Sequence, residues 1–135
     1  MKNLKNILFV LALLILDQLT KFYFIGKNIK IFEYFSFNFT ANTGIVFGFF
    51  KGMNLIFIFT SLIIICFVIY FYREKKLRLG FNFILAGAFG NLIDRIFRGY
   101  VVDFIDLKIW PVFNLADAFI VIGVLLLIYF MWKEK

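Results

Sequence analysis

The acidic side chains are the first candidates for chemistry in this sequence, because its 135 residues include no histidine. A Ser–His–Asp triad, a Cys–His pair and an imidazole metal site are therefore excluded. The sole cysteine, Cys66, excludes an internal disulfide and a thiolate metal site; we expect it to be a small buried apolar residue. A pair of carboxyl groups is then the strongest acid–base device available. The eight acidic residues are Asp17, Glu33, Glu74, Asp94, Asp103, Asp106, Asp117 and Glu134.

Asp117 stands out because nothing nearby in the sequence can neutralise it. It lies in a long apolar run with no Lys or Arg within one helical turn. Asn114, three residues earlier, shares its helical face. If the run spans a membrane, an ionised side chain within it costs about 2.5–3.5 kcal/mol on insertion scales, which makes it a functional candidate by default. Asp117 therefore needs a partner from elsewhere in the chain.

Asp103 is the partner that we expect for Asp117. It is framed by apolar neighbours in the extended segment 99–106. Asp103 and Asp106 have opposite parity on a strand and so face opposite ways, and Asp106, close to Lys108, is more simply a surface charge. Two carboxyl groups that share a site cannot both ionise easily, so one stays protonated while the other acts as a base. Aspartic proteases use this arrangement on a water molecule.

The composition sets the kind of element that must position these residues. Apolar residues make up 64% of the chain and the mean hydropathy is +0.96, against about 45–50% apolar residues in a soluble domain. A chain this short cannot bury that excess, so we expect a membrane protein that is mainly α-helical, in a single domain of residues 1–135. Spans need about 20 apolar residues. Four are predicted, at about residues 4–24, 54–72, 79–93 and 113–132.

The basic residues indicate how these spans are oriented. The net charge is +7, and the basic residues cluster at span ends, which favours anchoring over nucleic-acid binding. Residues 73–78 carry four positive charges and one negative charge, and both termini carry lysines. These three segments are predicted to be cytoplasmic. The loops 26–53 and 94–111 then lie outside, and Asp103 can meet Asp117 at the outer interface.

Two further patterns concern the support of the site. Residues 35–40 alternate strictly in polarity, residues 41–44 are typical of a turn, and residues 45–50 form a second extended segment, so a small sheet at the outer membrane surface is predicted. Asp17 and Lys21 have the spacing of a helical ion pair. Asn91 shares a helical face with Asp94 and Arg95, and glycines in the third span would allow close helix packing.

Five short motifs follow one another along the chain: DQLTK at 17–21, NTGIVF at 42–47, GAFGNLIDR at 87–95, GYVVDF at 99–104 and FNLAD at 113–117. In their order, and in their positions relative to the four spans, they resemble the lipoprotein signal peptidase (signal peptidase II) family over the whole chain. Two positions depart from the family pattern. Val46 stands where Ala or Ser is usual, and Ala86 stands where Gly is usual. These changes bear on the shape of the pocket and leave the activity in place.

The resemblance implies the roles of the motif residues. Asp103 and Asp117 match the catalytic dyad of an aspartic endopeptidase. The positions that bind substrate or brace the site match Asn42, Gly44, Asn91, Arg95 and Asn114. The positions of structural motif residues match Asp17, Lys21 and Asp94. The implied reaction removes the signal peptide from a prolipoprotein whose cysteine carries diacylglycerol, by cleavage just before that cysteine.

The resemblance also implies the setting of the enzyme. No metal and no organic cofactor is implied. The expected partners are lipid-modified prolipoproteins and membrane lipids, without nucleic acid, and the expected state is a monomer. The location is the bacterial cytoplasmic (inner) membrane, with several spans, cytoplasmic termini, and an active site beside a small β-cradle at the extracytoplasmic interface.

Two other classes of function remain as alternatives. A small transporter or channel component would need acidic residues along a path through the membrane, and nothing acidic lies between Asp117 and Glu134. A non-catalytic interaction subunit would use its polar residues to bind partner helices. That alternative leaves unexplained why two acidic residues on the outer side are embedded among apolar ones.

Overall fold

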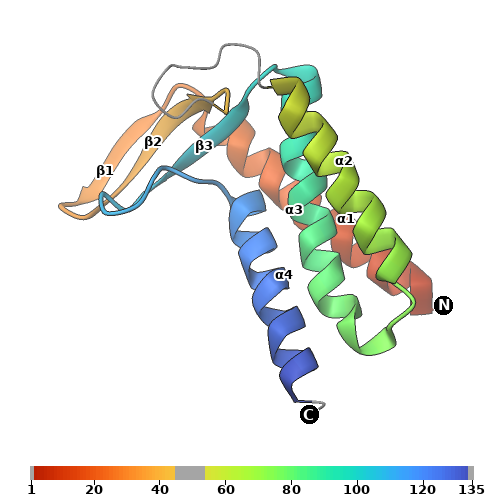
Figure 1. The fold of residues 1–135 in the computed structure, drawn as a ribbon. Helices are drawn as coiled ribbons and strands as arrows, with labels where there is room; N and C mark the ends of the chain where they lie inside the picture. Colours follow the sequence, from red (N-terminus) through yellow and green to blue (C-terminus); the bar gives the residue numbers. More distant parts are fainter. Residues whose placement is uncertain (1, 45–53, 134–135) are drawn as a thin grey trace.

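The described part of the protein consists of four long helices and a small antiparallel sheet (Figure 1). The computed structural model describes residues 2–44 and 54–133, with side chains from residue 4 onwards. The helices are α1 (Lys2–Phe24), α2 (Asn54–Phe71), α3 (Arg78–Phe97) and α4 (Leu115–Trp132), and a short 3-10 turn, η1 (Lys75–Leu77), precedes α3. The strands are β1 (Asn28–Phe32), β2 (Phe35–Asn42) and β3 (Val101–Asp106). The sheet lies at the end of the helix bundle opposite to both termini (Figure 1).

Among the described residues, three helices are long and apolar enough to cross a membrane: α1, α2 and α4. Their large apolar side chains are widely exposed, as a surface in contact with lipid requires. Cys66 is also exposed on α2, so the expectation that it is buried was wrong. The third predicted span, residues 79–93, corresponds to α3, which is more polar and does not meet the same criterion. Four spans therefore remain a prediction.

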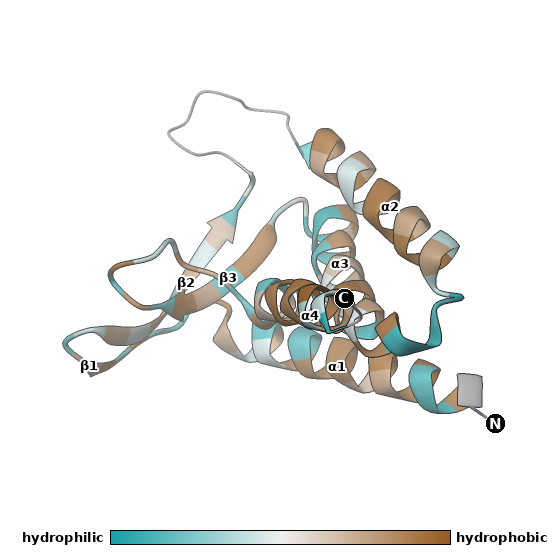
Figure 2. Cartoon of the chain, turned by 60° about the horizontal axis from the view of Figure 1, so that its bottom comes forward, coloured by the Kyte–Doolittle hydropathy of each residue, from teal (hydrophilic) through white to brown (hydrophobic). Residues whose placement is uncertain are grey.

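The helix α3 is the centre of the bundle, and α1, α2 and α4 each pack against it. Its glycines allow α4 to approach closely, as the sequence predicts. A Cβ atom on Gly87 would lie 2.3 Å from the carbonyl oxygen of Ala116, and one on Gly80 would lie 2.9 Å from that of Gly123. These contacts hold the first half of α4 against the first half of α3. Figure 2 shows the resulting bundle, with apolar residues along the helices and hydrophilic residues in the α2–α3 loop and near the N-terminus.

The sheet has the strand order β1-β2-β3, with both pairs antiparallel. The predicted strand 35–40 lies within β2, which continues through part of the predicted turn as far as Asn42. The predicted extended segment 99–106 contains β3, whereas β1 was not predicted. The second extended segment, residues 45–50, lies outside the described residues. A stack of Phe37, Phe24 and Phe104 joins the sheet to the end of α1, with ring centroids 4.5 and 4.6 Å apart.

Candidate active site

Asp117 is fixed in the first turn of α4 by a reciprocal cap with Asn114. The side-chain Oδ1 of Asn114 accepts a hydrogen bond from the backbone N–H of Asp117 at 3.0 Å. In return, the Oδ2 of Asp117 accepts one from the backbone N–H of Asn114 at 3.2 Å. This capping box satisfies two backbone donors that the start of a helix otherwise leaves unpaired. It explains why α4 begins two residues after the predicted start at 113, and it confirms that the two side chains share a face.

Asp103 projects from the middle of β3 and is only 1% exposed. Its Oδ2 accepts a hydrogen bond from the Nδ2 of Asn42 at 2.8 Å, and its Oδ1 accepts one from the Nδ2 of Asn114 at 2.6 Å. Asn114 therefore contacts both acidic residues, through its side chain to Asp103 and through its backbone to Asp117. The structure brings together the two aspartates that the sequence singled out, although they lie on different elements. Asp117 and Asn42 are more exposed than Asp103, so the pair is open on one side.

Asn91 of α3 supplies the other hydrogen bond to Asp117. Its Nδ2 donates to the Oδ1 of Asp117 at 2.8 Å. Its own Oδ1 accepts hydrogen bonds from the Nζ of Lys21 at 3.0 Å and from the Nδ2 of Asn114 at 3.2 Å. An amide whose oxygen faces a cation must turn its NH₂ group the other way. Lys21 thus sets the orientation in which Asn91 donates to the carboxylate.

A buried ionic cluster (Asp17, Lys21 and Asp94) lies beneath these amides. The Nζ of Lys21 is 2.9 Å from the Oδ2 of Asp17 and 3.1 Å from the Oδ2 of Asp94, and all three side chains are 0% exposed. The predicted pair of Asp17 with Lys21 is confirmed, and Asp94 is a further partner from α3. Buried charges are tolerated only when they are paired and hydrogen-bonded, and this cluster meets that condition.

The cluster also holds the two elements that carry the aspartates. The Oδ1 of Asp17 accepts a hydrogen bond from the backbone N–H of Ala116 at 2.9 Å, in the first turn of α4. The Oδ2 of Asp94 accepts one from the backbone N–H of Val102 at 3.0 Å, next to Asp103. One carboxylate therefore anchors each of these two elements. These backbone contacts of Asp17 and Asp94 were not predicted from the sequence, and the structural role of the two residues stays a prediction.

Gln18 and Arg98 complete the surroundings of Asp94, and the sequence analysis missed both. The Nε2 of Gln18 donates to the Oδ1 of Asp94 at 3.2 Å, and Arg98 forms an ion pair with the same carboxylate. Gln18 belongs to the DQLTK motif at residues 17–21, so the motif could have identified it as a candidate site residue. Arg98 follows Asp94 by four residues, so the helical spacing rule could have found that pair.

Gly44 and Arg95 both lie close to the aromatic ring of Phe57. The backbone N–H of Gly44 donates to the Oδ1 of Asn42 at 2.8 Å, and its φ of +80° favours glycine. A Cβ atom at Gly44 would lie only 2.1 Å from the ring of Phe57. The guanidinium carbon of Arg95 is 5.1 Å from the centre of the same ring. The charge of Arg95 interacts electrostatically with Asp117 and Asp103. Gly44 therefore shapes the turn that orients Asn42.

The two aspartates of β3 have opposite electrostatic surroundings. Burial raises the pKa of Asp103 to about 6, and the charge of Asp117 adds to the rise, while the hydrogen bonds from Asn42 and Asn114 oppose it. The hydrogen bonds from Lys108 lower the pKa of Asp106 to about 2. Of these two aspartates, Asp103 is the one whose carboxyl group can hold a proton near neutral pH.

Asp106 is paired with Lys108 as the sequence suggested, with 2.6 Å between Oδ2 and Nζ. It is not an open surface charge, however, because only 9% of the residue is exposed. Asn38 donates to the same oxygen at 2.7 Å and covers it. In the described part of the chain, Asp103 and Asp106 share no hydrogen-bond partner, in agreement with their opposite parity.

Two remaining expectations concern the pocket and metals. Ala86, one of the two departures from the family pattern, is fully buried in α3, and the other, Val46, lies outside the described residues. Within residues 2–44 and 54–133, no group of three or more His, Cys, Asp or Glu side chains is placed to hold a metal ion.

Comparison with known proteins identifies the family of this chain. Residues 9–133 match the family described as signal peptidase (SPase) II. The chain belongs to the signal peptidase II family. Proteins named lipoprotein signal peptidase from Halothermothrix orenii and Clostridium novyi are 40% and 37% identical to it. The alignment with the first covers 93% of this chain and 94% of the relative, and with the second 96% and 98%.

Solved structures agree with the fold of this signal peptidase II family member. Two structures described as a bacterial membrane enzyme superpose with TM-scores of 0.84 and 0.87, each at 31% identity. They cover 96% and 97% of this chain and 88% and 94% of their own. With its three helices able to cross a membrane, the chain is a bacterial membrane protein of a peptidase family.

Proposed function

We propose that this chain is a membrane-embedded aspartic endopeptidase that removes signal peptides from diacylglyceryl-modified prolipoproteins, with cleavage just before the lipidated cysteine. The observation that carries the proposal is the convergence of Asp103 and Asp117 on Asn114. Membership of the signal peptidase II family supports the peptidase activity, and the names of the relatives support the class of substrate.

In the proposed reaction, Asp103 holds the proton of the pair, because burial raises its pKa to about 6. Asp117 is then the carboxylate that takes a proton from water while the water oxygen attacks the scissile carbonyl carbon. Asp103 gives its proton to the carbonyl oxygen, which forms a neutral tetrahedral intermediate. When the intermediate collapses, the C–N bond breaks and Asp117 returns its proton to the leaving amine. Asp103 takes back a proton from the hydroxyl group that becomes the carbonyl of the product acid, which restores the starting state of the pair. Asn91 and Asn114 keep the carboxylate of Asp117 in place throughout.

The proposed orientation follows from charge. The termini and the basic segment 73–78 lie in the cytoplasm, and the sheet with the two aspartates lies at the extracytoplasmic surface. There, water reaches the pair, while the substrate's lipid and signal helix remain in the bilayer. Strand β1 is exposed along its whole length, and among the described residues no strand pairs with its outer edge, so an extended substrate segment can pair there. Asn42 and Gly44 lie at the end of β2, beside Asp103.

The experiment that tests this function uses the purified chain in detergent with two forms of one prolipoprotein, with and without the diacylglyceryl group. We expect cleavage of the lipidated form just before its cysteine, and little cleavage of the unmodified form. Mass spectrometry of the products locates the cut, and the Asp117→Asn variant controls for contaminating proteases. Cleavage of both forms at similar rates would reject the lipidated substrate class, and equal turnover by Asp117→Asn would reject the proposed chemistry.

A further inference from the structure

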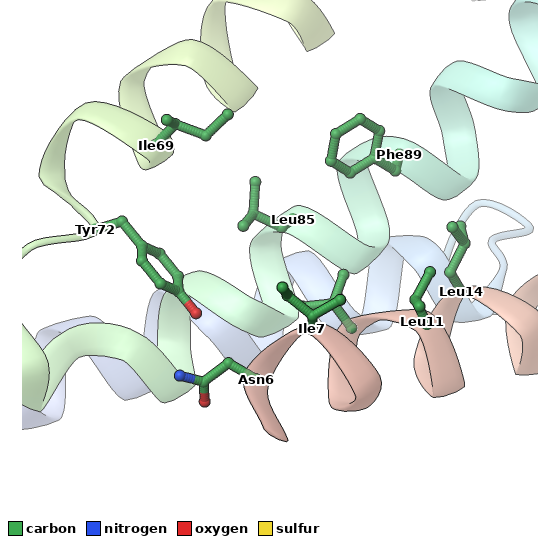
Figure 3. Close-up of a pocket in the computed structure, with 9 residues that line it drawn as sticks. Asn6, Ile7, Leu11, Leu14, Ile69, Tyr72, Leu85 and Phe89 are labelled. Carbon is green, nitrogen blue, oxygen red and sulfur yellow. The ribbon is translucent and has the colours of Figure 1, made fainter. Parts of the chain in front are cut away.

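An apolar groove of about 580 Å³ lies between α1, α2 and α3, in the half of the bundle nearer to the N-terminus. Figure 3 shows the side chains that line it, with Asn6 and Tyr72 at one end and Leu14 and Phe89 at the other. The groove is distinct from the two aspartates, which lie at the end of the bundle beside the sheet. Its volume is within the range of about 300–1,000 Å³ that is usual for ligand sites.

The groove exists because the two outer helices do not close over α3. In the described part of the chain, α1 and α2 each pack on α3 rather than on one another. Ile7 and Leu11 of α1 and Ile69 of α2 are 55%, 45% and 59% exposed, and all three line the groove. The groove is therefore open along the surface that a membrane helix presents to lipid.

One end of the groove is polar. The hydroxyl of Tyr72 donates a hydrogen bond to the Oδ1 of Asn82 at 2.5 Å, and the Nδ2 of Asn82 donates to the Oδ1 of Asn6 at 3.2 Å. Tyr72 and Asn6 line the apolar groove, and Asn6 and Asn82 also line a second pocket next to it. The two hollows are therefore adjacent and share Asn6 in their walls.

The second pocket, which we call the basic mouth, has the opposite character. It is lined by Lys5, Asn6, Lys75, Lys76, Arg78, Leu79 and Asn82. Lys5 comes from the start of α1, and the other three basic residues come from η1 and the start of α3, so residues distant in sequence gather there. Four cations next to an apolar groove form a surface that complements a negative headgroup joined to a hydrocarbon tail.

We propose that the groove and the basic mouth bind one anionic phospholipid from the membrane leaflet on the side of the N-terminus. The acyl chain lies in the groove, and the phosphate lies among Lys5, Lys75 and Arg78. The length of the groove fits one leaflet. From Asn6 to Leu14, a helix rises about 12 Å, whereas half of the hydrocarbon core of a bilayer is about 15 Å thick.

Two other occupants fit less well. A transmembrane helix, such as the signal helix of a substrate, would need a surface about 30 Å long. The segment that precedes a signal helix is also positively charged, and the basic mouth would repel it. A soluble phosphate would bind at the basic mouth without using the apolar groove. The position of the basic mouth next to the apolar groove therefore favours a lipid.

The test is a titration of the purified full-length chain with phosphatidylglycerol or phosphatidylcholine of identical acyl chains, followed by native mass spectrometry. The double variant Lys5→Gln/Lys75→Gln removes two charges from the basic mouth. The matched control, Arg73→Gln/Lys133→Gln, removes two charges from the same end of the bundle without touching residues that line either hollow. Leu11→Trp and Ile69→Trp fill the groove from α1 and from α2, and both positions are exposed, so at least one of these variants should fold.

We expect the wild type to prefer phosphatidylglycerol, and the Lys5/Lys75 variant to bind it roughly twenty- to thirtyfold more weakly, given the usual contribution of a basic residue near an anionic lipid. The control should stay within about twofold of the wild type, because its charges lie outside the basic mouth. The tryptophan variants should weaken both lipids. Three results would overturn the proposal: equal losses in the control and the Lys5/Lys75 variant, competition by inorganic phosphate at the same concentration as the lipid, or unchanged lipid binding in the tryptophan variants.

Discussion

The central helix α3 carries a polar cluster near each end, and the two clusters differ in charge. Near the sheet, Asn91 and Asp94 join Lys21 and Asp17 in a network of buried ions. At the opposite end of α3, near the N-terminus of the chain, Asn82 forms hydrogen bonds with Tyr72 and Asn6. We call these three uncharged residues the neutral cluster. Both clusters connect α3 to α1, so holding those helices together does not by itself require ions.

The difference lies in what each cluster supports. Ions buried in a low-dielectric interior carry a large desolvation cost, and replacing them with apolar residues is often neutral or stabilising. The ionic cluster nevertheless orients Asn91 towards Asp117 and fixes the backbone beside both aspartates. The neutral cluster contacts neither aspartate in the described part of the chain. The buried charges thus lie where the positions of two carboxyl groups must be fixed relative to one another. At the other end of α3, neutral side chains are sufficient to join it to α1.

The largest effect is expected at the pair itself. Asp103→Asn or Asp117→Asn should each lower the rate of cleavage by roughly a hundred- to ten-thousandfold, because an amide acts neither as the acid nor as the base of the pair. The protein should remain folded. The measurement is the initial rate on a lipidated prolipoprotein, beside the melting temperature in detergent.

Asp106→Asn is the matched control, since it changes the same residue type on the same strand. Its carboxylate faces Ser36, Asn38 and Lys108, away from Asn114, so it should keep most of the activity. A loss equal to that of Asp103→Asn would mean that the opposite facing of the two residues does not separate their roles.

The next effect tests the ionic cluster. Lys21→Met should strand Asp17 and Asp94, and Asp17→Asn should leave Lys21 with one carboxylate fewer. Each change should reduce the free energy of unfolding by about 3–5 kcal/mol, the usual cost of breaking a buried ion pair. The double variant should recover part of the loss, since it removes both charges of one pair. Thermal unfolding in detergent measures all three.

Lys21 also allows a sharper distinction between positioning and chemistry. Suppose that Lys21→Met abolishes turnover while the melting temperature and substrate binding are unchanged. Lys21 would then take part in proton transfer, and the comparison between a supporting ionic cluster and a reacting pair of aspartates would be wrong.

A smaller effect is expected in the pH profile. Since Asp103 must hold a proton and burial raises its pKa to about 6, kcat/KM should fall as the pH rises through about 6. The hydrogen bond from Asn42 lowers this pKa, so Asn42→Ala should raise it and move the alkaline limb to higher pH. The value observed belongs to the coupled pair. A limb that stays in place, or moves to lower pH, would contradict the assignment of the proton to Asp103.

The parts of the site that the sequence predicted are those set by local spacing. The pair of Asp17 with Lys21 follows from the helical repeat, as does the shared face of Asn114 and Asp117. The contacts of Lys21 with Asn91 and Asp94 join residues at least seventy positions apart, and no local rule places them. They depend on the way in which α1 packs against α3.

Two elements were predicted incompletely for related reasons. The third span was expected to end at residue 93, where the apolar run stops, but α3 continues to Phe97 because Asp94 is neutralised by Lys21 and Arg98. Strand β1 was not predicted, although its residues 28–31 alternate in polarity. The alternation covers only four residues and all five residues of β1 are exposed, so its pairing with β2 holds it in place.

The smallest effect is expected in the neutral cluster. Tyr72→Phe removes one hydroxyl and leaves the Oδ1 of Asn82, a residue only 2% exposed, without the hydrogen bond from Tyr72. The loss of one neutral hydrogen bond should cost about 1–2 kcal/mol, clearly less than Lys21→Met, and cleavage should proceed at the wild-type rate. Asn82→Ala removes both bonds of the cluster and should cost more than Tyr72→Phe but still spare activity. If either variant slowed cleavage as much as Lys21→Met does, the two ends of α3 would be coupled, and the neutral cluster would also support the pair of aspartates.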